Sequence, residues 1–160
     1  MILVTVGMQL GFDRLIRAMD ALAPQLGMPV VAQTGGGTFR PLNMDIRDRI
    51  APDEFEALAG QARLVVSHAG IGTVLTAQRC GAPVVLMPRR AGRGEHRNDH
   101  QLATVKALEG RPGIFVAMDE THLPEQIEQG LALIEWSPGR SGSAESLVAS
   151  IAQFVETGRL

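Results

Sequence analysis

The segment VVSHAGIGTVLTAQRCGAPVVLMPRR, residues 65–90, decides the fold class. It begins with an apolar run, turns polar at Ser67 and His68, and then passes Gly70 and Gly72. A stretch of helical composition follows, and a second apolar run closes the segment. Short apolar runs bounded by glycine and proline are typical of buried strands. The segment therefore predicts a strand, a glycine turn, a helix and a second strand.

The same alternation extends to both sides of this segment. The sequence predicts strands at residues 2–6, 29–33, 64–67, 83–87 and 114–117, with a further short strand near 44–50. It predicts helices at residues 12–22, 52–62, 73–80, 100–108 and 123–134, and a final helix within 143–157. Strands that alternate with helices indicate one α/β domain with a mainly parallel sheet over residues 1–160. Ligands of such sheets bind beyond the carboxyl ends of the strands.

Composition excludes several classes of protein. The 160 residues suffice for one domain, and the net charge of −2 with 4% aromatic residues gives no basis for nucleic-acid binding. Cys80 is the single cysteine, so no internal disulfide forms, which fits a reducing compartment. We find no signal peptide and no apolar run near the ~20 residues of a membrane span. These features predict a cytoplasmic protein without a membrane span of its own, one that can still dock on a membrane partner.

The glycine turn is a candidate anion site. Gly70 and Gly72 let the backbone approach a ligand, and a helix that begins near Thr73 offers unpaired N–H groups. A phosphate or pyrophosphate would suit it, although a tight turn without any ligand fits the same residues. A nicotinamide-dinucleotide site is a weaker alternative, because Leu75 stands where its fingerprint has a third small residue and the motif lies mid-chain.

The charged segment at residues 89–101 is the second candidate. It contains four arginines and two histidines beside Glu95 and Asp99, and it follows a central predicted strand. Such a segment is either a solvated surface or a place where arginines pair with phosphate or carboxylate groups. The spacing of its histidines fits no standard zinc pattern, so we predict no metal. His68, directly after a strand, is more typical of a hydrogen-bonding loop residue than of a general base.

Three motifs in this order resemble a known family. SHAGIGTVLTA, GAPVVLMPRR and NDHQLA, together with the opening VTVG, resemble the C-terminal, donor-binding half of family 28 glycosyltransferases. The likeness is greatest to Alg13-like subunits and to the bacterial polysaccharide-biosynthesis subunits called PssE or EpsF, and it covers residues 1 to about 116. It implies a Rossmann-like domain of GT-B type, with helices on both faces of the sheet, that binds a UDP-sugar.

The resemblance also implies roles for particular residues. The turn would face the diphosphate, His100 and Gln101 would contact the sugar, and Arg89 and Arg90 would contact phosphate or a uronic-acid carboxylate. Thr76 stands where many family members carry a ribose-binding glutamate. These enzymes are inverting and need no bound metal or other cofactor, because a helix dipole stabilises the departing UDP. The implied substrate-binding set is Gly7, His68, Ala69, Gly70, Ile71, Gly72, Thr73, Thr76, Arg89, Arg90, His100 and Gln101.

The resemblance finally implies a partner. Full-length relatives carry an N-terminal acceptor domain that supplies catalytic groups, and no catalytic residue is identified in residues 1–160. An Alg14-like or PssD-like membrane-anchored subunit would supply the acceptor site. The final helix would face this partner or cover the domain's own sheet. We therefore predict the donor-binding subunit of a two-component glycosyltransferase that moves a sugar from UDP to a lipid-linked or polysaccharide acceptor. A stand-alone nucleotide-sugar epimerase or hydrolase and a non-catalytic nucleotide-sugar sensor are the alternatives.

Overall fold

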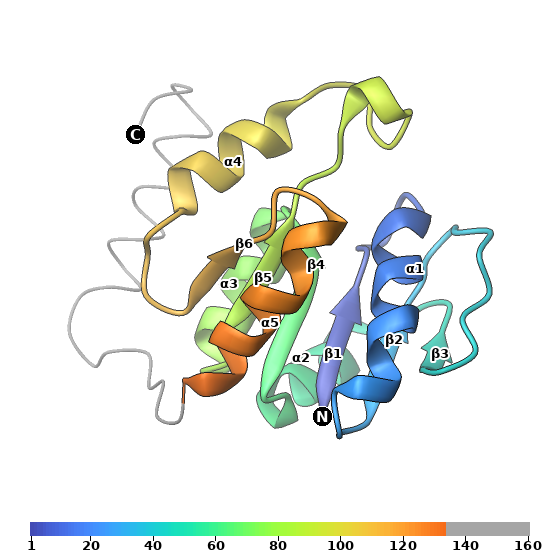
Figure 1. Cartoon of the computed structure of the whole chain (residues 1–160), viewed down its shortest axis with the longest axis vertical. Helices are drawn as coiled ribbons and strands as arrows, with labels where there is room; N and C mark the ends of the chain where they lie inside the picture. The colour runs from blue at the N-terminus through green and yellow to red at the C-terminus, as the bar shows by residue number, and fades with distance from the viewer. Residues whose placement is uncertain (134–160) are drawn as a thin grey trace.

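A computed structural model describes residues 1–133, so the predicted final helix lies outside the described residues. The described strands form one six-stranded, fully parallel sheet in the order β3-β2-β1-β4-β5-β6 (Figure 1). Their bounds are β1 Ile2–Thr5, β2 Val30–Gln33, β3 Asp45–Arg47, β4 Leu64–His68, β5 Val84–Met87 and β6 Ile114–Val116. The predicted α/β class with a parallel, Rossmann-like sheet is confirmed.

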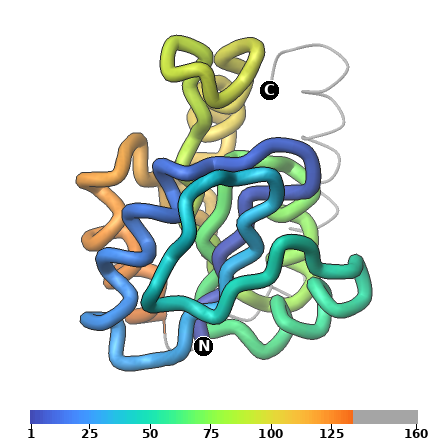
Figure 2. Tube along the Cα trace, turned by 90° about the vertical axis from the view of Figure 1, so that its right-hand side faces the viewer, coloured from blue at the N-terminus to red at the C-terminus, as the bar shows by residue number. Residues whose placement is uncertain are grey.

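Helices cover both faces of this sheet. Their bounds are α1 Asp13–Leu22, α2 Pro52–Gln61, α3 Ile71–Arg79, α4 His100–Leu108 and α5 Leu123–Ala132, with 3₁₀ turns η1 Ala23–Gln25, η2 Ala91–Arg93 and η3 Glu120–His122. Figure 1 shows α1 and α5 on one face, with α2 and α3 behind the sheet. The connection between β5 and α4 rises beyond the carboxyl ends of the strands, and Figure 2 shows it projecting from the body of the domain.

The core divides into two apolar layers because each central strand buries side chains on both faces. Leu15, Ile16 and Met19 of α1 pack with Val4 and other residues of the α1/α5 face. Val74, Ala77 and Val105 of α3 and α4 fill the opposite layer. The helical spacing predicted for α1 is confirmed, since these three α1 side chains are fully buried. This core fixes the strand ends on which the site is built.

One helix boundary differs from the prediction in a way that matters for the site. Helix α3 begins at Ile71, not at Thr73, and Gly70 is its N-cap residue. The first turn closes through a hydrogen bond from the Val74 amide to the Gly70 carbonyl at 3.2 Å. Gly72 therefore lies within the first helical turn and not in the preceding loop. Glycine disfavours a helix by about 1 kcal/mol, so packing of Val74 and Ala77 overrides its local preference.

Two carboxylates of α1 hold the connection between β2 and β3. Asp13 accepts hydrogen bonds from the amides of Thr38 and Phe39 and from the Thr38 hydroxyl. Asp20 accepts from the amides of Leu42 and Asn43 at 2.9 and 2.7 Å. The glycine-rich segment after β2 is thereby fixed beside the carboxyl edge of the sheet.

Candidate functional site

Two adjoining cavities lie at the carboxyl edge of the sheet. The first, which we call the α3 cavity, has a volume of about 380 Å³ and is lined by Thr5, Gly7, Met8, Gln33, Ile50, Pro52, Phe55, His68, Gly70, Gly72, Thr73 and Thr76. The second, the α4 cavity, has a volume of about 240 Å³ and is lined by Val6, Gly7, Met8, Gln9, Leu10, His68, Arg89, His96 and Gln101. Gly7, Met8 and His68 line both, so the His68 imidazole stands where the two cavities meet.

The N-terminus of α3 opens into the α3 cavity. Its cap residue, Gly70, provides no side-chain acceptor. In the described part of the chain, the hydrogen bonds include no acceptor for the amides of Ile71, Gly72 and Thr73. A Cβ at Gly72 would meet nothing within 4 Å, so this part of the turn is open. Free amides and the positive end of the helix dipole make the turn able to hold an anion.

The imidazole of His68 is held between two glycines. A Cβ at Gly7 would lie 2.8 Å from His68 Cε1, and a Cβ at Gly70 would collide with His68 Nε2. Gly7 also has a φ of +79°, which disfavours other residues. The close approach at Gly70 therefore serves the chain's own imidazole, a constraint that the glycine pattern alone does not reveal. Ile71 and Thr73, which follow in α3, are half-buried, and Ala69 is buried.

His68 is neutral at physiological pH. Burial is the main cause that lowers its pKa to about 4, and the Arg89 and His96 charges lower it further. A hydrogen bond with the Thr5 backbone acts in the opposite direction. The Ser67 hydroxyl lies 3.2 Å from His68 Nδ1. A neutral imidazole can offer one N–H donor and one acceptor at the junction of the cavities.

The Arg89 guanidinium donates its hydrogen bonds to the protein's own backbone. Its guanidinium is almost fully buried and donates to four backbone carbonyls, those of Val6, Leu10 and Gly11 at 2.7, 2.7 and 2.5 Å and that of Glu95 at 3.3 Å. The guanidinium also stacks over the Phe12 ring at 4.7 Å. Burial lowers the pKa of Arg89 to about 10, so the side chain stays charged. Its place in the structure is that of a clamp between the loop after β1 and the loop after β5.

A second arginine reinforces that clamp. Arg14 of α1 makes a bidentate pair with Glu95 at 2.6 and 2.8 Å and donates to Glu120 at 2.9 Å. Glu95 Oε2, one of the two oxygens that pair with Arg14, also accepts the Arg90 amide at 2.9 Å. Burial alone would raise the pKa of Glu95, but these hydrogen bonds outweigh it and the pKa lies below its ordinary value. No sequence signal marks Arg14, because an arginine in an amphipathic helix is usually solvated.

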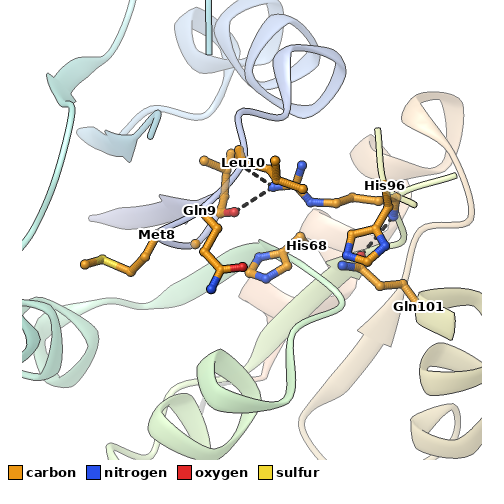
Figure 3. A pocket seen from close by; sticks show the side chains of 9 residues that line it. Met8, Gln9, Leu10, His68, His96 and Gln101 are labelled. Carbon is orange, nitrogen blue, oxygen red and sulfur yellow. Dashed lines mark hydrogen bonds between the residues drawn. The ribbon is translucent and has the colours of Figure 1, made fainter. Parts of the chain in front are cut away.

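The remaining predicted residues of the second motif lie in different places. Gln101 is buried and its Oε1 accepts the Arg89 amide at 3.0 Å, while its side chain lines the α4 cavity beside His96 (Figure 3). His100 is exposed and pairs with Asn98 and with the His96 ring, 4.6 Å away. Arg90 donates to the Met118 carbonyl at 2.9 Å. Neither His100 nor Arg90 lines the two cavities.

The structure adds residues to the α3 cavity that the predicted substrate-binding set does not contain. Ile50, Pro52 and Phe55, from the start of α2 and the residues before it, form an apolar wall. Thr76 of α3, which the set does contain, lies on the same cavity. Thr5 and Gln33, at the ends of β1 and β2, are also part of the lining. A polar residue at the end of a buried strand is a signal that could have identified Gln33. The apolar wall had no such signal, since its residues resemble ordinary core positions.

Comparison with known proteins identifies the family. The model for "Glycosyltransferase family 28 C-terminal domain" matches residues 1–150, and the chain belongs to this family. The narrower likeness to Alg13-like or PssE and EpsF subunits is not established by this match. No curated protein matches the sequence.

Solved structures support the fold. The glycosyltransferase of kitacinnamycin aligns with a TM-score of 0.63 at 19% identity, over 99% of this chain and 40% of its own. The Streptomyces sp. SF2575 glycosyltransferase SsfS6, complexed with thymidine diphosphate, aligns with a TM-score of 0.56 at 21% identity. This alignment covers 95% of this chain and 37% of SsfS6. The glycosyltransferase SnogD from Streptomyces nogalater aligns with a TM-score of 0.50 at 23% identity, over 97% of this chain and 39% of its own. The chain therefore has the fold of one part of these enzymes and spans about two fifths of their length.

Two features of the described residues concern metal binding and the membrane. Within residues 1–133, no three histidine, cysteine, aspartate or glutamate side chains gather as a metal site would require. None of the described helices has the length and apolar character needed to cross a membrane.

Proposed function

We propose that this chain is the donor-binding subunit of an inverting two-component glycosyltransferase, which moves a sugar from a UDP-sugar to a lipid-linked or polysaccharide acceptor. The observation that carries the proposal is the free N-terminus of α3 at the mouth of a cavity, in a chain of this glycosyltransferase family. The amides of Ile71, Gly72 and Thr73 would hold the diphosphate. Ala69 and Gly70 would shape the turn that presents them.

The two cavities suggest how the donor lies. A nucleobase fits the apolar wall of the α3 cavity, where Phe55 offers an aromatic surface, and the hydroxyl of Thr76 would meet the ribose. The sugar would extend past His68 into the α4 cavity, where Gln101 provides an amide. SsfS6 was solved with thymidine diphosphate, which supports a pyrimidine nucleotide as donor group.

Neutral His68 fits a position beside a diphosphate. A neutral imidazole can donate its N–H to a phosphate oxygen without releasing or taking up a proton near pH 7, because its pKa is about 4. Charge on the departing UDP would then be stabilised by α3 and by His68 rather than by a metal. Arg89 would act indirectly, by holding the loop that contains Gly7, and Arg90 and His100 would need to move to reach a ligand.

The acceptor site is proposed to come from outside the described domain. The chain spans about two fifths of its structural neighbours, and the cleft of a GT-B enzyme lies between two halves. The rim of the α4 cavity exposes two large apolar side chains, Met8 at 59% and Leu10 at 47%. We propose that an Alg14-like or PssD-like membrane-anchored subunit covers this rim and supplies the general base.

Calorimetry with UDP and a panel of UDP-sugars tests donor binding. We expect binding by the wild-type protein and at least a tenfold weaker affinity in Gly72→Val, because its branched side chain would occupy the space in front of the α3 amides. Arg97→Ala, an exposed change outside both cavities, is the matched control. Unchanged UDP affinity in a folded Gly72→Val variant would show that the diphosphate binds elsewhere.

Transfer assays test the two-component role. Radiolabelled UDP-sugar incubated with the chain alone should give no lipid-linked product, and membranes that contain the partner should restore transfer. Hydrolysis or epimerisation of a UDP-sugar by the chain alone would favour a stand-alone enzyme. Tight binding without transfer, even beside the partner, would favour a sensor.

A further inference from the structure

Three polar side chains stand in a row at the carboxyl edge of the sheet. Parallel pairing places Thr5 of β1 opposite Gln33 of β2 on one side and opposite Ser67 of β4 on the other. All three are buried, with exposed fractions of 1, 3 and 0%. Neighbouring positions Leu3, Val31 and Val65 on the same strand faces are apolar and belong to the core layer opposite α1 and α5. A buried polar row at this place requires partners, because a buried polar group without a hydrogen-bond partner is destabilising.

Thr5 and Gln33 are linked by a hydrogen-bond relay with a fixed direction. The Gly7 amide, which can only donate, donates to Thr5 Oγ1 at 3.2 Å. Thr5 Oγ1 in turn donates to Gln33 Oε1 at 2.6 Å. The Thr5 hydroxyl has one proton, and Gln33 Oε1 is its acceptor among the described residues. This relay fixes the orientation of the Gln33 amide, with its oxygen toward Thr5.

The other end of the amide is poorly satisfied. Gln33 Nε2 carries two N–H donors, and its acceptor in residues 1–133 is the Met8 sulfur at 3.7 Å, a weak acceptor. Gln33 lines the α3 cavity together with the apolar wall formed by Ile50, Pro52 and Phe55. Met8 is itself 59% exposed and extends away from His96 and Gln101, so a ligand can displace its sulfur (Figure 3). Among the described residues, this buried donor thus faces the cavity without a strong partner.

We infer that Gln33 selects the nucleobase of the donor by donating to the 4-oxygen of the base, and that it favours uracil or thymine over cytosine. The inference rests on the proposed function, since it assigns a base-reading role within the proposed donor site. A carbonyl oxygen in the apolar α3 cavity satisfies the free N–H of Gln33. The amino group that cytosine carries in place of the 4-oxygen of uracil brings a donor against a donor. Such a mismatch leaves both groups unpaired in a buried site.

The role of Thr5 is to fix which end of the Gln33 amide, its nitrogen or its oxygen, faces the base. An amide that is free to rotate presents either its nitrogen or its oxygen, and it then accepts a carbonyl or an amino group equally well. The Gly7-to-Thr5 donation removes this freedom, because the Thr5 proton is directed at Gln33 Oε1. Thr5 is therefore a positioning residue for specificity, and Gln33 is the residue that contacts the base.

Calorimetry with UDP, CDP and inorganic pyrophosphate tests the inference. Wild-type protein should bind UDP about tenfold or more tightly than CDP, as one mismatched buried hydrogen bond implies. Gln33→Leu should bring the two affinities within about threefold of each other, and Thr5→Val should reduce the ratio while weakening UDP less. Pyrophosphate affinity should not change in either variant. Thr34→Val, a buried change next to Gln33 that does not line the α3 cavity, is the control and should behave as wild type.

A second variant covers the case in which Gln33→Leu does not fold. Gln33→Glu keeps the shape and the oxygen that accepts from Thr5, but it replaces the donor with an acceptor. It should lose UDP more strongly than CDP. Equal losses of UDP and CDP in the Gln33 variants, or an unchanged ratio, would overturn the role of Gln33 while leaving donor binding intact. Failure of the wild-type chain to bind any of the nucleotides would instead overturn the proposed function, and this inference with it.

Discussion

Two segments at the same edge of the sheet use their polar groups in opposite ways. Residues 68–76 contain no side-chain charge, yet the amides at the start of α3 have no acceptor among the residues that the structure describes. Residues 89–101 are rich in charge, yet Arg89 donates to backbone carbonyls and Glu95 pairs with Arg14 of the same domain. The number of charged residues in a loop therefore does not show whether the loop can bind a ligand. What matters is which donors the fold leaves without an acceptor.

The largest expected effect comes from removing the clamp. Arg89→Ala would remove an almost fully buried guanidinium that donates to four backbone carbonyls, and we expect a loss of about 4 kcal/mol in the free energy of unfolding. Arg89→Lys should rescue little, because a single ammonium cannot reproduce the planar fork. Urea unfolding of both variants measures the effect, with Arg97→Ala as the control within about 0.5 kcal/mol of wild type. A stable Arg89→Ala protein that only loses UDP affinity would make Arg89 a ligand residue instead.

The next effect concerns pH and the buried imidazole. The unfolded chain takes up a proton on His68 near pH 6.5, whereas the folded chain resists it until about pH 4. Stability should therefore fall as pH decreases through this window, by up to about 3 kcal/mol from this group. His68→Gln should remove that part of the pH dependence. The measurement compares the unfolding free energies of the two proteins at about pH 4.5 and about pH 7. These two pH values span most of the range over which His68 titrates in one state but not in the other. A constant difference would mean that His68 titrates normally.

A third comparison separates the two glycines of the turn. Gly70→Ala places a Cβ against the His68 imidazole and should destabilise the fold. Gly72→Ala meets open space inside a helix and should raise stability by up to about 1 kcal/mol. UDP affinity, by contrast, should fall in Gly72→Val by about 1.4 kcal/mol or more. Thermal unfolding and calorimetry on the three variants test this division. Equal destabilisation by Gly70→Ala and Gly72→Ala would contradict it.

The smallest effect is expected at Gln101. Gln101→Ala removes the acceptor of the Arg89 amide and should cost about 1 kcal/mol of stability. Gln101→Glu keeps an acceptor for this amide but removes the side-chain donor that faces the α4 cavity. We expect Gln101→Glu to weaken UDP-sugar binding several-fold while UDP binding changes less, measured by calorimetry. If both ligands weaken equally, Gln101 acts through the Arg89 loop and not through the sugar.

Much of the fold and part of the site could be predicted from the sequence. The apolar runs that became β1, β2, β4 and β5 have one physical explanation, burial on both faces of a parallel sheet, so their pattern was unambiguous. The predicted start of α3 is wrong by two residues, because glycine composition favours a loop while the packing of Val74 decides the helix. The helix after residue 123 and the strand near residue 114 were also found, with ends that differ by one or two residues.

By itself, the sequence determined the class of the sheet, the glycine turn and its place after a central strand, since these depend on local apolar periodicity and on backbone freedom. Tertiary structure alone decided which polar groups remain available. The Arg89 guanidinium meets carbonyls 78 to 83 positions away in the sequence, and Thr5 fixes the amide of Gln33, 28 positions away. No local pattern encodes such pairings, because they arise only when the strand ends are brought together at one edge. Within residues 1–133, the amides at the start of α3 and the side-chain N–H of Gln33 are donors that this assembly leaves without a strong acceptor.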